Sequence, residues 1–280
     1  MAIFADTFST MDYIEILGYL AAGLIGVSLG LIGGGGSILT VPVLKYIFHL
    51  DTVTSTAYSL FIVGATSLVG TIPKYKQGLV NIKTGIIFGA PSILAVYATR
   101  KWLVPFIPDV VFQIDSFAFT KSMFLMSLFA ILMVFASVSM IRKPKVKEDS
   151  NNSQNIGFNY PLILIEGATV GVLTGLVGAG GGFLIIPALV LFTGLPMKEA
   201  VGTSLMIIAA KSLIGFTGDL TSMNINWSLL MSVTGIAISG IFAGNYLSNK
   251  IEANRLKYAF GWFVLAMGIY ILLKELVFTS

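Results

Sequence analysis

The sequence contains no cysteine and a single histidine, His49, and only 11% of its 280 residues are charged. Without cysteine there are no disulfides, thiolate metal sites or cysteine nucleophiles, and one histidine is too few for a multi-histidine metal site. An ordinary soluble domain has about a quarter of its residues charged. The shortage of charge, together with 56% hydrophobic residues, predicts an integral membrane protein. The shortage of cysteine and histidine predicts that it holds no metal and uses no cofactor.

Nucleotide-binding motifs are missing as well. Neither glycine cluster, Gly33–Gly36 or Gly178–Gly182, reads G-x-G-x-x-G in register, and no Gly-Lys-Ser/Thr follows, so the chain shows no ATPase motif. The lone histidine lies near the end of an apolar run, which argues against an intramembrane serine protease. Lysine and arginine occupy short loops, where membrane topology explains the net charge of +4 better than nucleic acid binding does. We therefore expect no enzyme activity and no nucleic acid partner.

Apolar runs separated by polar residues cover the whole chain. They predict an all-α polytopic membrane protein with about 8 to 10 helical segments, because helices satisfy their own backbone hydrogen bonds in lipid. No lysine or arginine precedes the first run, so a cleaved signal peptide is not expected there. The expected segments are Glu15–Ile32, Ile38–Phe48, Ser55–Ile72, Lys83–Ala98, Lys121–Ile141, Pro161–Val177, Phe183–Phe192, Ala200–Thr217, Trp227–Leu247 and Leu256–Leu273.

The two halves of the chain repeat each other. GLIGGGGSILTVPVL (residues 30–44) returns as GLVGAGGGFLIIPAL (residues 175–189), and the two halves align without a gap at an offset of 145 residues over roughly residues 26–82. We interpret this pattern as a duplication, with a first repeat over residues 1–141, a polar cytoplasmic linker over 142–159 and a second repeat over 160–280. Identical pairs include Gly33/Gly178, Pro42/Pro187, Ser59/Ser204, Ser67/Ser212 and Asn81/Asn226.

The distribution of basic residues predicts the orientation. If the N-terminus is outside, the inside loops hold most of the lysine and arginine. Matching loops differ in charge, because residues 74–81 are basic whereas their repeat equivalent, 219–226, contains no lysine or arginine. This opposite bias predicts two repeats that are inverted relative to each other. Arg100 and Lys101 depart from the pattern, since we expect them in an outside loop.

The glycine clusters predict where helices break. Glycine in a helix interior costs roughly 1 kcal/mol relative to alanine, so each cluster should end one helix before a short one begins. The short segments would be about 15 to 17 Å long, too short for a hydrocarbon core of roughly 30 Å. Short segments at corresponding positions of two halves are typical of a transporter's binding site. Close helix packing is the alternative role of these glycines.

Two helix N-termini that meet near the membrane midplane would bind a small anion. Each N-terminus carries about half a positive charge and unpaired N–H donors, and glycine lets an oxyanion approach the backbone. Hydroxyl groups after the short helices either donate to the substrate or cap their helices. The expected substrate-binding residues are Gly33, Gly34, Gly35, Gly36, Ser37, Ser59, Gly178, Gly180, Gly181, Gly182, Ser204 and Lys211.

Two charged residues lie inside expected helices. Burial of a lysine in a membrane span costs about 2.5 to 3.5 kcal/mol, and we interpret Lys211 as the fixed cation of the site. The alternative is a lysine that reaches the interface or is paired for structural reasons. Glu166, a few residues inside its segment, either carries a coupling proton or faces the membrane interface.

The duplicated glycine-rich segments that end in a proline, on a chain of this length and hydropathy, resemble the TauE/SafE sulfite exporter family. The resemblance extends over essentially the whole chain. It implies a multi-pass carrier of the inner membrane that moves a small sulfur-containing anion, such as sulfite, thiosulfate or an organosulfonate, without nucleotide hydrolysis. With the expected site it implies a secondary transporter, working as an exporter by alternating access.

An anion-selective channel on the same helix N-termini is the alternative. The expected partners are the anion and the lipid bilayer, and a homo-oligomer is left open.

Overall fold

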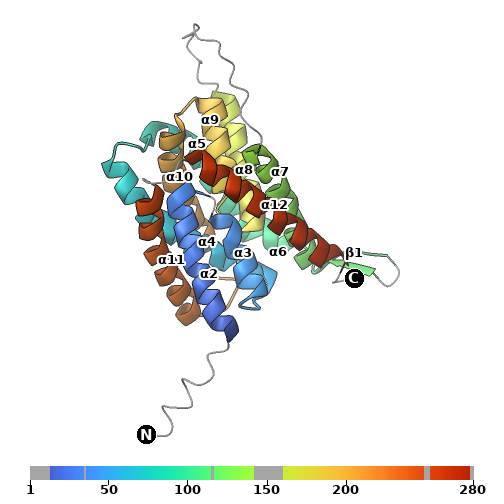
Figure 1. Cartoon of the computed structure of the whole chain (residues 1–280). Coiled ribbons are helices and arrows are strands. Elements are labelled where there is room, and N and C mark those ends of the chain that lie inside the picture. The colour runs from blue at the N-terminus through green and yellow to red at the C-terminus, as the bar shows by residue number, and fades with distance from the viewer. Residues whose placement is uncertain (1–12, 35, 115–116, 142–159, 249–252, 278–280) are drawn as a thin grey trace, which may run out of the picture.

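The computed structural model describes residues 13–34, 36–114, 117–141, 160–248 and 253–277 (Figure 1). Each helical segment expected from the sequence is present as a helix. A short two-stranded hairpin and a π-helical turn, η1, were not expected. The elements are α2 (Tyr13–Ile32), α3 (Ser37–Tyr46), α4 (Thr52–Lys76), α5 (Ile82–Ala98), η1 (Thr99–Leu103), α6 (Val104–Phe106), β1 (Val110–Ile114), β2 (Phe117–Thr120), α7 (Lys121–Ile141), α8 (Tyr160–Val177), α9 (Gly182–Thr193), α10 (Met197–Thr217), α11 (Trp227–Ser248) and α12 (Ala253–Val277).

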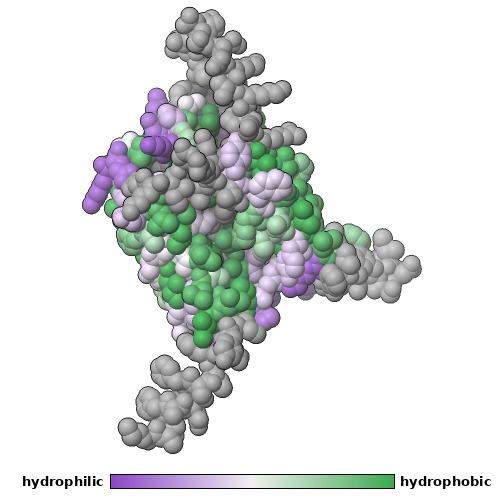
Figure 2. All heavy atoms as spheres, viewed as in Figure 1, coloured by the Kyte–Doolittle hydropathy of each residue, from purple (hydrophilic) through white to green (hydrophobic). Residues whose placement is uncertain are grey.

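Six helices are long and apolar enough to cross a membrane, which together with α8 and α12 gives six to eight spans. The six are Glu15–Ile32, Thr52–Lys76, Ile82–Phe106, Lys121–Val138, Met197–Thr217 and Trp227–Ser248. Large apolar side chains such as Leu24, Leu94 and Phe135 point away from the bundle. Figure 2 shows apolar residues over the middle of the visible face and hydrophilic ones at its upper left edge. Such a surface suits a lipid environment.

Short polar side chains cap the long helices α4, α5 and α11. The Asp51 carboxylate accepts a hydrogen bond from Thr54 N (3.0 Å) at the start of α4. Asn81 caps α5 in the same way, and Asn226, its repeat equivalent, caps α11. Both asparagines therefore start helices, and this shared role explains their match across the repeat without any role in binding.

The short helices α3 and α9 each contain a proline at the same place. Pro42 lies in α3 and Pro187 in α9. Proline has no backbone N–H, so the carbonyl four residues earlier loses its helical partner in each helix. The 10 residues of α3 and 12 residues of α9 span only about half of the hydrocarbon core.

Helix pairs that join the two halves of the chain form the core of the bundle. α2 packs along α11, α5 along α8, α4 along α10 and α7 along α12, and Figure 1 shows α2 beside α11 and α7 beside α12. Glycine permits the close approach, because a Cβ on Gly26 would collide with the backbone of Ala237. A Cβ on Gly171 of α8 would likewise lie 2.6 Å from the carbonyl oxygen of Ser92 on α5.

The β-hairpin between α6 and α7 is antiparallel and pairs Val110 with Thr120 and Phe112 with Phe119. The two phenylalanine rings stack with centroids 4.7 Å apart. The hairpin projects from the helical bundle at the lower right of Figure 1 and takes no part in the contact between the glycine loops.

Candidate functional site

The two glycine loops touch each other. The first loop separates α2 from α3, and the second separates α8 from α9. A Cβ on Gly34 would lie 2.7 Å from the Cα of Gly182, so the backbones of the loops are in contact. The expected binding residues of the two loops therefore lie together, apart from Gly35, which is outside the described residues.

Left-handed glycines end α2 and α8 at equivalent positions. Gly33 has φ 77° and Gly178 has φ 72°. The N–H of each bonds the carbonyl four residues earlier, at 2.7 Å and 2.8 Å. Gly180 and Gly181 are also left-handed, with φ 62° and 70°. Because other residues adopt this conformation only at a cost, glycine at these positions fixes the end of one helix and the turn into the next.

The N-termini of α3 and α9 both follow a glycine that provides no capping side chain. The N-cap residues are Gly36 and Gly181, and neither helix has a side-chain cap. Ser37, an expected binding residue, donates instead to Gly34 O (2.7 Å) within its own loop. Among the described residues, no acceptor bonds the N–H groups of Gly182 and Phe183, the first two residues of α9, which suits an acceptor that is not part of the helix.

Lys211 of α10 is fully buried beside the start of α9. Its Nζ donates to Thr174 Oγ1 on α8 (3.1 Å), and a Cβ on Gly181 would lie 2.9 Å from the same Nζ. The salt bridges Lys45–Glu275 and Arg100–Asp219 do not include Lys211. An anion between a lysine ammonium and the positive end of a helix is stabilised by both. The geometry therefore suits an anion that bridges the ammonium and the helix N-terminus.

Buried hydroxyl groups surround the second loop, and several have no hydrogen-bond partner. Ser212 Oγ has none, and it lies 3.4 Å from the position of a Cβ on Gly180. Ser59 Oγ also has none. Its repeat equivalent, Ser204, donates to Gly33 O (3.3 Å) and Val201 O (2.8 Å). The two expected site residues therefore differ in their hydrogen bonds. The Ser204 hydroxyl donates to backbone carbonyls, whereas the Ser59 hydroxyl is free to bind a ligand.

Arg100 was expected in an outside loop, and that expectation is wrong. The side chain is 0% exposed and lies in η1, which continues α5. Nε bonds Asp219 Oδ2 at 2.6 Å, and Nη1 donates to Thr56 Oγ1 (3.0 Å) and Gly175 O (3.3 Å). Nη2 has no partner. Hydropathy could not reveal this burial, because Arg100 begins the polar pair with Lys101 that closes an apolar run.

The Asp219 carboxyl, just beyond the end of α10, responds to two opposing influences. Burial raises its pKa above the ordinary value, while the Arg100 guanidinium acts to lower it through charge and a hydrogen bond. The pair connects η1 of the first half of the chain with the α10–α11 connection of the second half.

Glu166 lies away from the glycine loops. It is on α8, eight residues before Thr174, which corresponds to about 12 Å along the helix. One carboxylate oxygen, Oε2, is buried without a hydrogen-bond partner, although the side chain as a whole is partly exposed. The structure therefore does not bring Glu166 to the site around Lys211.

Residues 26–30 have the Gly-x-Ser-x-Gly spacing of hydrolase nucleophiles, but they lie inside α2 and not at a strand–helix turn. The Ser28 hydroxyl has no hydrogen-bond partner, and His49 is exposed beyond the end of α3. The described residues form no nucleophile–base pair at this place.

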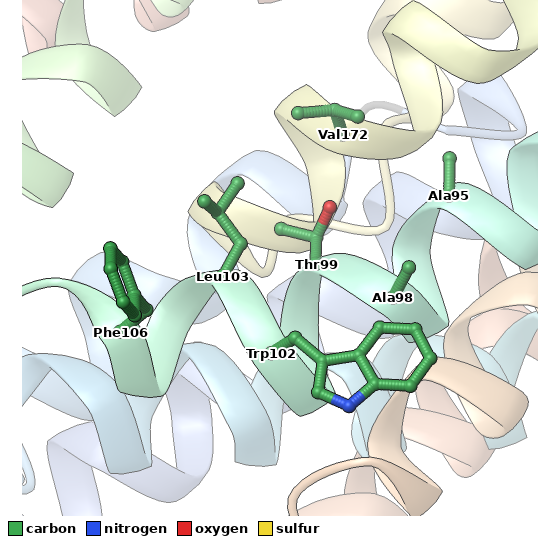
Figure 3. A pocket seen from close by; sticks show the side chains of 7 residues that line it. All are labelled: Ala95, Ala98, Thr99, Trp102, Leu103, Phe106 and Val172. Atoms are coloured by element: carbon green, nitrogen blue, oxygen red, sulfur yellow. The ribbon is translucent and has the colours of Figure 1, made fainter.

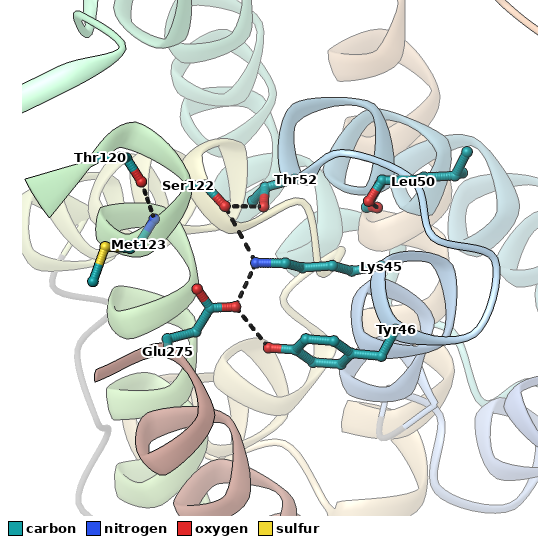
Figure 4. Close-up of polar contacts among 9 residues, drawn as sticks. Lys45, Tyr46, Leu50, Thr52, Thr120, Ser122, Met123 and Glu275 are labelled. Atoms are coloured by element: carbon teal, nitrogen blue, oxygen red, sulfur yellow. Dashed lines mark hydrogen bonds and ion pairs between the residues drawn. The ribbon is translucent and has the colours of Figure 1, made fainter. Parts of the chain in front are cut away.

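A polar cluster joins the end of α3 to α7 and α12 (Figure 4). Lys45 Nζ lies 2.5 Å from Glu275 Oε1, and Tyr46 OH donates to the same oxygen at 2.9 Å. Lys45 also donates to Ser122 Oγ (3.2 Å). The cluster fixes the far end of α3, the end opposite to the glycine loop.

An open groove of about 380 Å³ lies where η1 and the end of α5 pass α8 (Figure 3). No charged side chain lines it, so it suits an apolar chain better than an anion. The lining residues are Ala95, Ala98, Thr99, Trp102, Leu103, Phe106 and Val172.

Comparison with known proteins gives a family and several relatives. A family model described as sulfite exporter TauE/SafE matches residues 18–271. A probable membrane transporter protein of Xylella fastidiosa is 27% identical over 262 residues, which is 91% of this chain and 94% of the relative. YdhB, a probable membrane transporter protein of Bacillus subtilis, is 28% identical over 237 residues, 84% of this chain and 91% of YdhB. A probable membrane transporter protein of Haemophilus influenzae is 25% identical over 273 residues, 92% of this chain and 98% of the relative. No significant match to a solved structure was found.

Proposed function

Since the chain belongs to the sulfite exporter TauE/SafE family, which consists of membrane transporters and not enzymes, we propose that it exports a small sulfur-containing anion such as sulfite, thiosulfate or an organosulfonate. The observation that carries the proposal is the fully buried Lys211 ammonium beside the N-terminus of α9. Oxyanions accept hydrogen bonds from ammonium, hydroxyl and backbone N–H donors, and all three kinds of donor meet at this place. The substrate-binding residues would be those of the two glycine loops with Ser59 and Lys211, with Ser204 supporting the first loop through Gly33 O.

Alternating access is the mechanism that the arrangement supports. The helix contacts of the bundle stay the same when the two repeats are exchanged. α2 packs on α11, and its equivalent α8 packs on α5, the equivalent of α11. In the other two pairs, α4 with α10 and α7 with α12, each helix packs on its own equivalent. Two similar halves around a central site can rock against each other without rebuilding either half. The glycine loops lie where the halves meet, so the anion would be exposed to one side and then to the other.

The charges of matching loops support a membrane orientation that is part of the proposal. We place the N-terminus and residues 219–226 outside, and the basic residues 74–81 inside, in the inner membrane. The division into repeats 1–141 and 160–280 belongs to the same proposal. The linker 142–159, assigned to the cytoplasmic side, lies outside the described residues.

A channel is the second candidate, because helix N-termini and a lysine also form anion filters. Purified protein in liposomes distinguishes the two. At a clamped membrane potential, a carrier takes up labelled sulfite or thiosulfate in a saturable way, and faster when the liposomes already contain the unlabelled anion, whereas flux through a channel is not accelerated by the internal anion. Absence of uptake of sulfite, thiosulfate and sulfoacetate alike would contradict the proposed function.

Substitution of Lys211 tests the site directly. Lys211→Met should raise the half-saturating anion concentration at least about tenfold, because one charge-assisted hydrogen bond is lost. The matched control is Lys198→Met, which removes an exposed lysine at the start of the same helix. If both variants transport like the wild type, Lys211 has a structural role only.

Glu166 is the proposed carrier of a coupling proton, which its partnerless buried oxygen supports. Glu166→Gln should then leave anion binding intact but abolish the stimulation of uptake by a pH gradient. Stimulation equal to that of the wild type would remove Glu166 from the coupling mechanism.

A further inference from the structure

Arg100 and Lys211 are anchored to adjacent residues of the last turn of α8. Lys211 Nζ donates to Thr174 Oγ1 and Arg100 Nη1 to Gly175 O. Both basic side chains are 0% exposed, although they come from different helices. The turn that precedes the second glycine loop therefore has two buried cations beside it.

The hydrogen bonds of Arg100 are incomplete on one edge. A guanidinium has five N–H donors, and a carboxylate that stabilises it structurally usually takes two of them in a bidentate pair. Here Asp219 bonds Nε, while Nη2 on the same edge is buried with no partner. A buried donor without a partner costs free energy, so a ligand with acceptor oxygens would be stabilised at Nη2.

A line of further donors connects Arg100 with the second loop. Thr56 of α4 accepts from Arg100, and Val63 of α4 contacts the position of a Cβ on Gly180. Ser59 lies three residues after Thr56 and four before Val63, on the same face of the helix. Its hydroxyl has no partner either. Two donors without partners, Arg100 Nη2 and the Ser59 hydroxyl, thus lie one after the other between Arg100 and the second glycine loop.

We propose that Arg100 is a second binding position for the transported anion, at which the anion competes with Asp219 for the guanidinium. The inference rests on the proposed function and adds a residue and a step to it. In the empty protein Asp219 neutralises Arg100. An anion that moves between Lys211 and the Asp219 side of the bundle passes Ser59, bonds Nη2 and displaces the carboxylate. Arg100 contacts the substrate in this account, and Asp219 is a positioning residue.

Two variants test the proposal by equilibrium binding of labelled thiosulfate and sulfite to the purified protein. Asp219→Asn removes the competitor, so the dissociation constant should fall about threefold or more while uptake becomes slower, because the anion leaves Arg100 less readily. Arg100→Lys keeps the charge and the contact with Asp219 but has no second nitrogen, so the dissociation constant should rise about tenfold. Lys101→Gln, which changes an exposed neighbour, is the control and should bind like the wild type.

The outcomes separate this inference from the proposed function. A wild type that binds neither anion contradicts the proposed function. If the wild type binds the anions, but Asp219→Asn does not bind them more tightly and Arg100→Lys binds them equally well, the role of Arg100 is overturned and the proposed function is not. If neither variant elutes as a folded protein, the pair is a structural one and the inference is overturned as well.

Discussion

At the scale of single residues, the two buried cations show what a sequence reveals. Lys211 stands alone inside an apolar run, so its burial could be predicted from the cost of a charge in a membrane span. Arg100 follows the apolar run and precedes Lys101 and Trp102, a pattern typical of a helix end at the interface. It is buried because the chain does not leave the helix at Ala98: Arg100 follows Ser92 and Val96 at intervals of four residues, on the buried face of α5, and the helix continues through the π-helical turn. No hydropathy pattern encodes that turn.

The serines show a second limit at this scale. Ser59 and Ser204 match across the repeat, and the sequence predicted equal roles. The structure gives Ser204 two carbonyl acceptors and Ser59 none. Ser212 was matched with Ser67 but not predicted in the site, because its closeness to Gly180 depends on how α10 packs on the loop.

The left-handed Gly181 leads to a stability prediction. Gly181→Ala should lower the free energy of unfolding by about 2 kcal/mol or more, because alanine is strained at this φ and its Cβ would collide with Thr174. Gly235→Ala is the control, since nothing lies within 4 Å of a Cβ there. Thermal unfolding in detergent measures both. Equal midpoints for the two variants would show that the loop is not held in this conformation.

At the scale of elements, the glycine clusters were the most informative feature of the sequence. They placed the breaks between α2 and α3 and between α8 and α9 to within a few residues, because glycine disfavours helix interiors and suits left-handed ends. The hairpin of β1 and β2 was not predicted, since its strands are short and lie in a segment expected as a loop. The same applies to the attachment of α3 to α12, which depends on contacts between residues far apart in the chain.

This attachment of α3 is testable. Glu275→Gln should destabilise the protein by about 2 kcal/mol, because it leaves the Lys45 ammonium without its carboxylate, though the 15% exposure of Lys45 keeps the loss below that of a fully buried pair. Adding Lys45→Met should recover part of the loss, since the unpaired charge disappears. Independent, additive effects of the two changes on the unfolding midpoint would mean that the ion pair does not couple α3 to α12.

At the scale of the whole molecule, the sequence predicted a duplicated membrane protein but not which helices pair. The offset of 145 residues aligns α2 with α8 and α5 with α11. In the bundle, each of these helices packs mainly on a helix of the other half, α2 on α11 and α5 on α8. Such pairing depends on the fit of glycines against backbone, as at Gly26 and Gly171. Hydropathy does not reveal the paired face, because both the buried and the lipid-facing sides of a membrane helix are apolar.

The proposed inversion can be tested with single cysteines, since the chain has none of its own. Gln77 and Ser222 are exposed repeat equivalents after α4 and α10. A membrane-impermeant maleimide should label Ser222→Cys in intact cells, and Gln77→Cys only after permeabilisation. Labelling of both variants from the same side would rule out an inverted pair of repeats.

In the proposed function, the transported anion binds between the Lys211 ammonium and the N-terminus of α9. The most direct measurement is anomalous diffraction from crystals of the wild-type protein soaked with selenite, a heavier analogue of sulfite. We expect a selenium peak in contact with Lys211 Nζ and the first backbone N–H groups of α9. A saturated, transport-competent protein with its peak elsewhere, or with no peak at all, would contradict it.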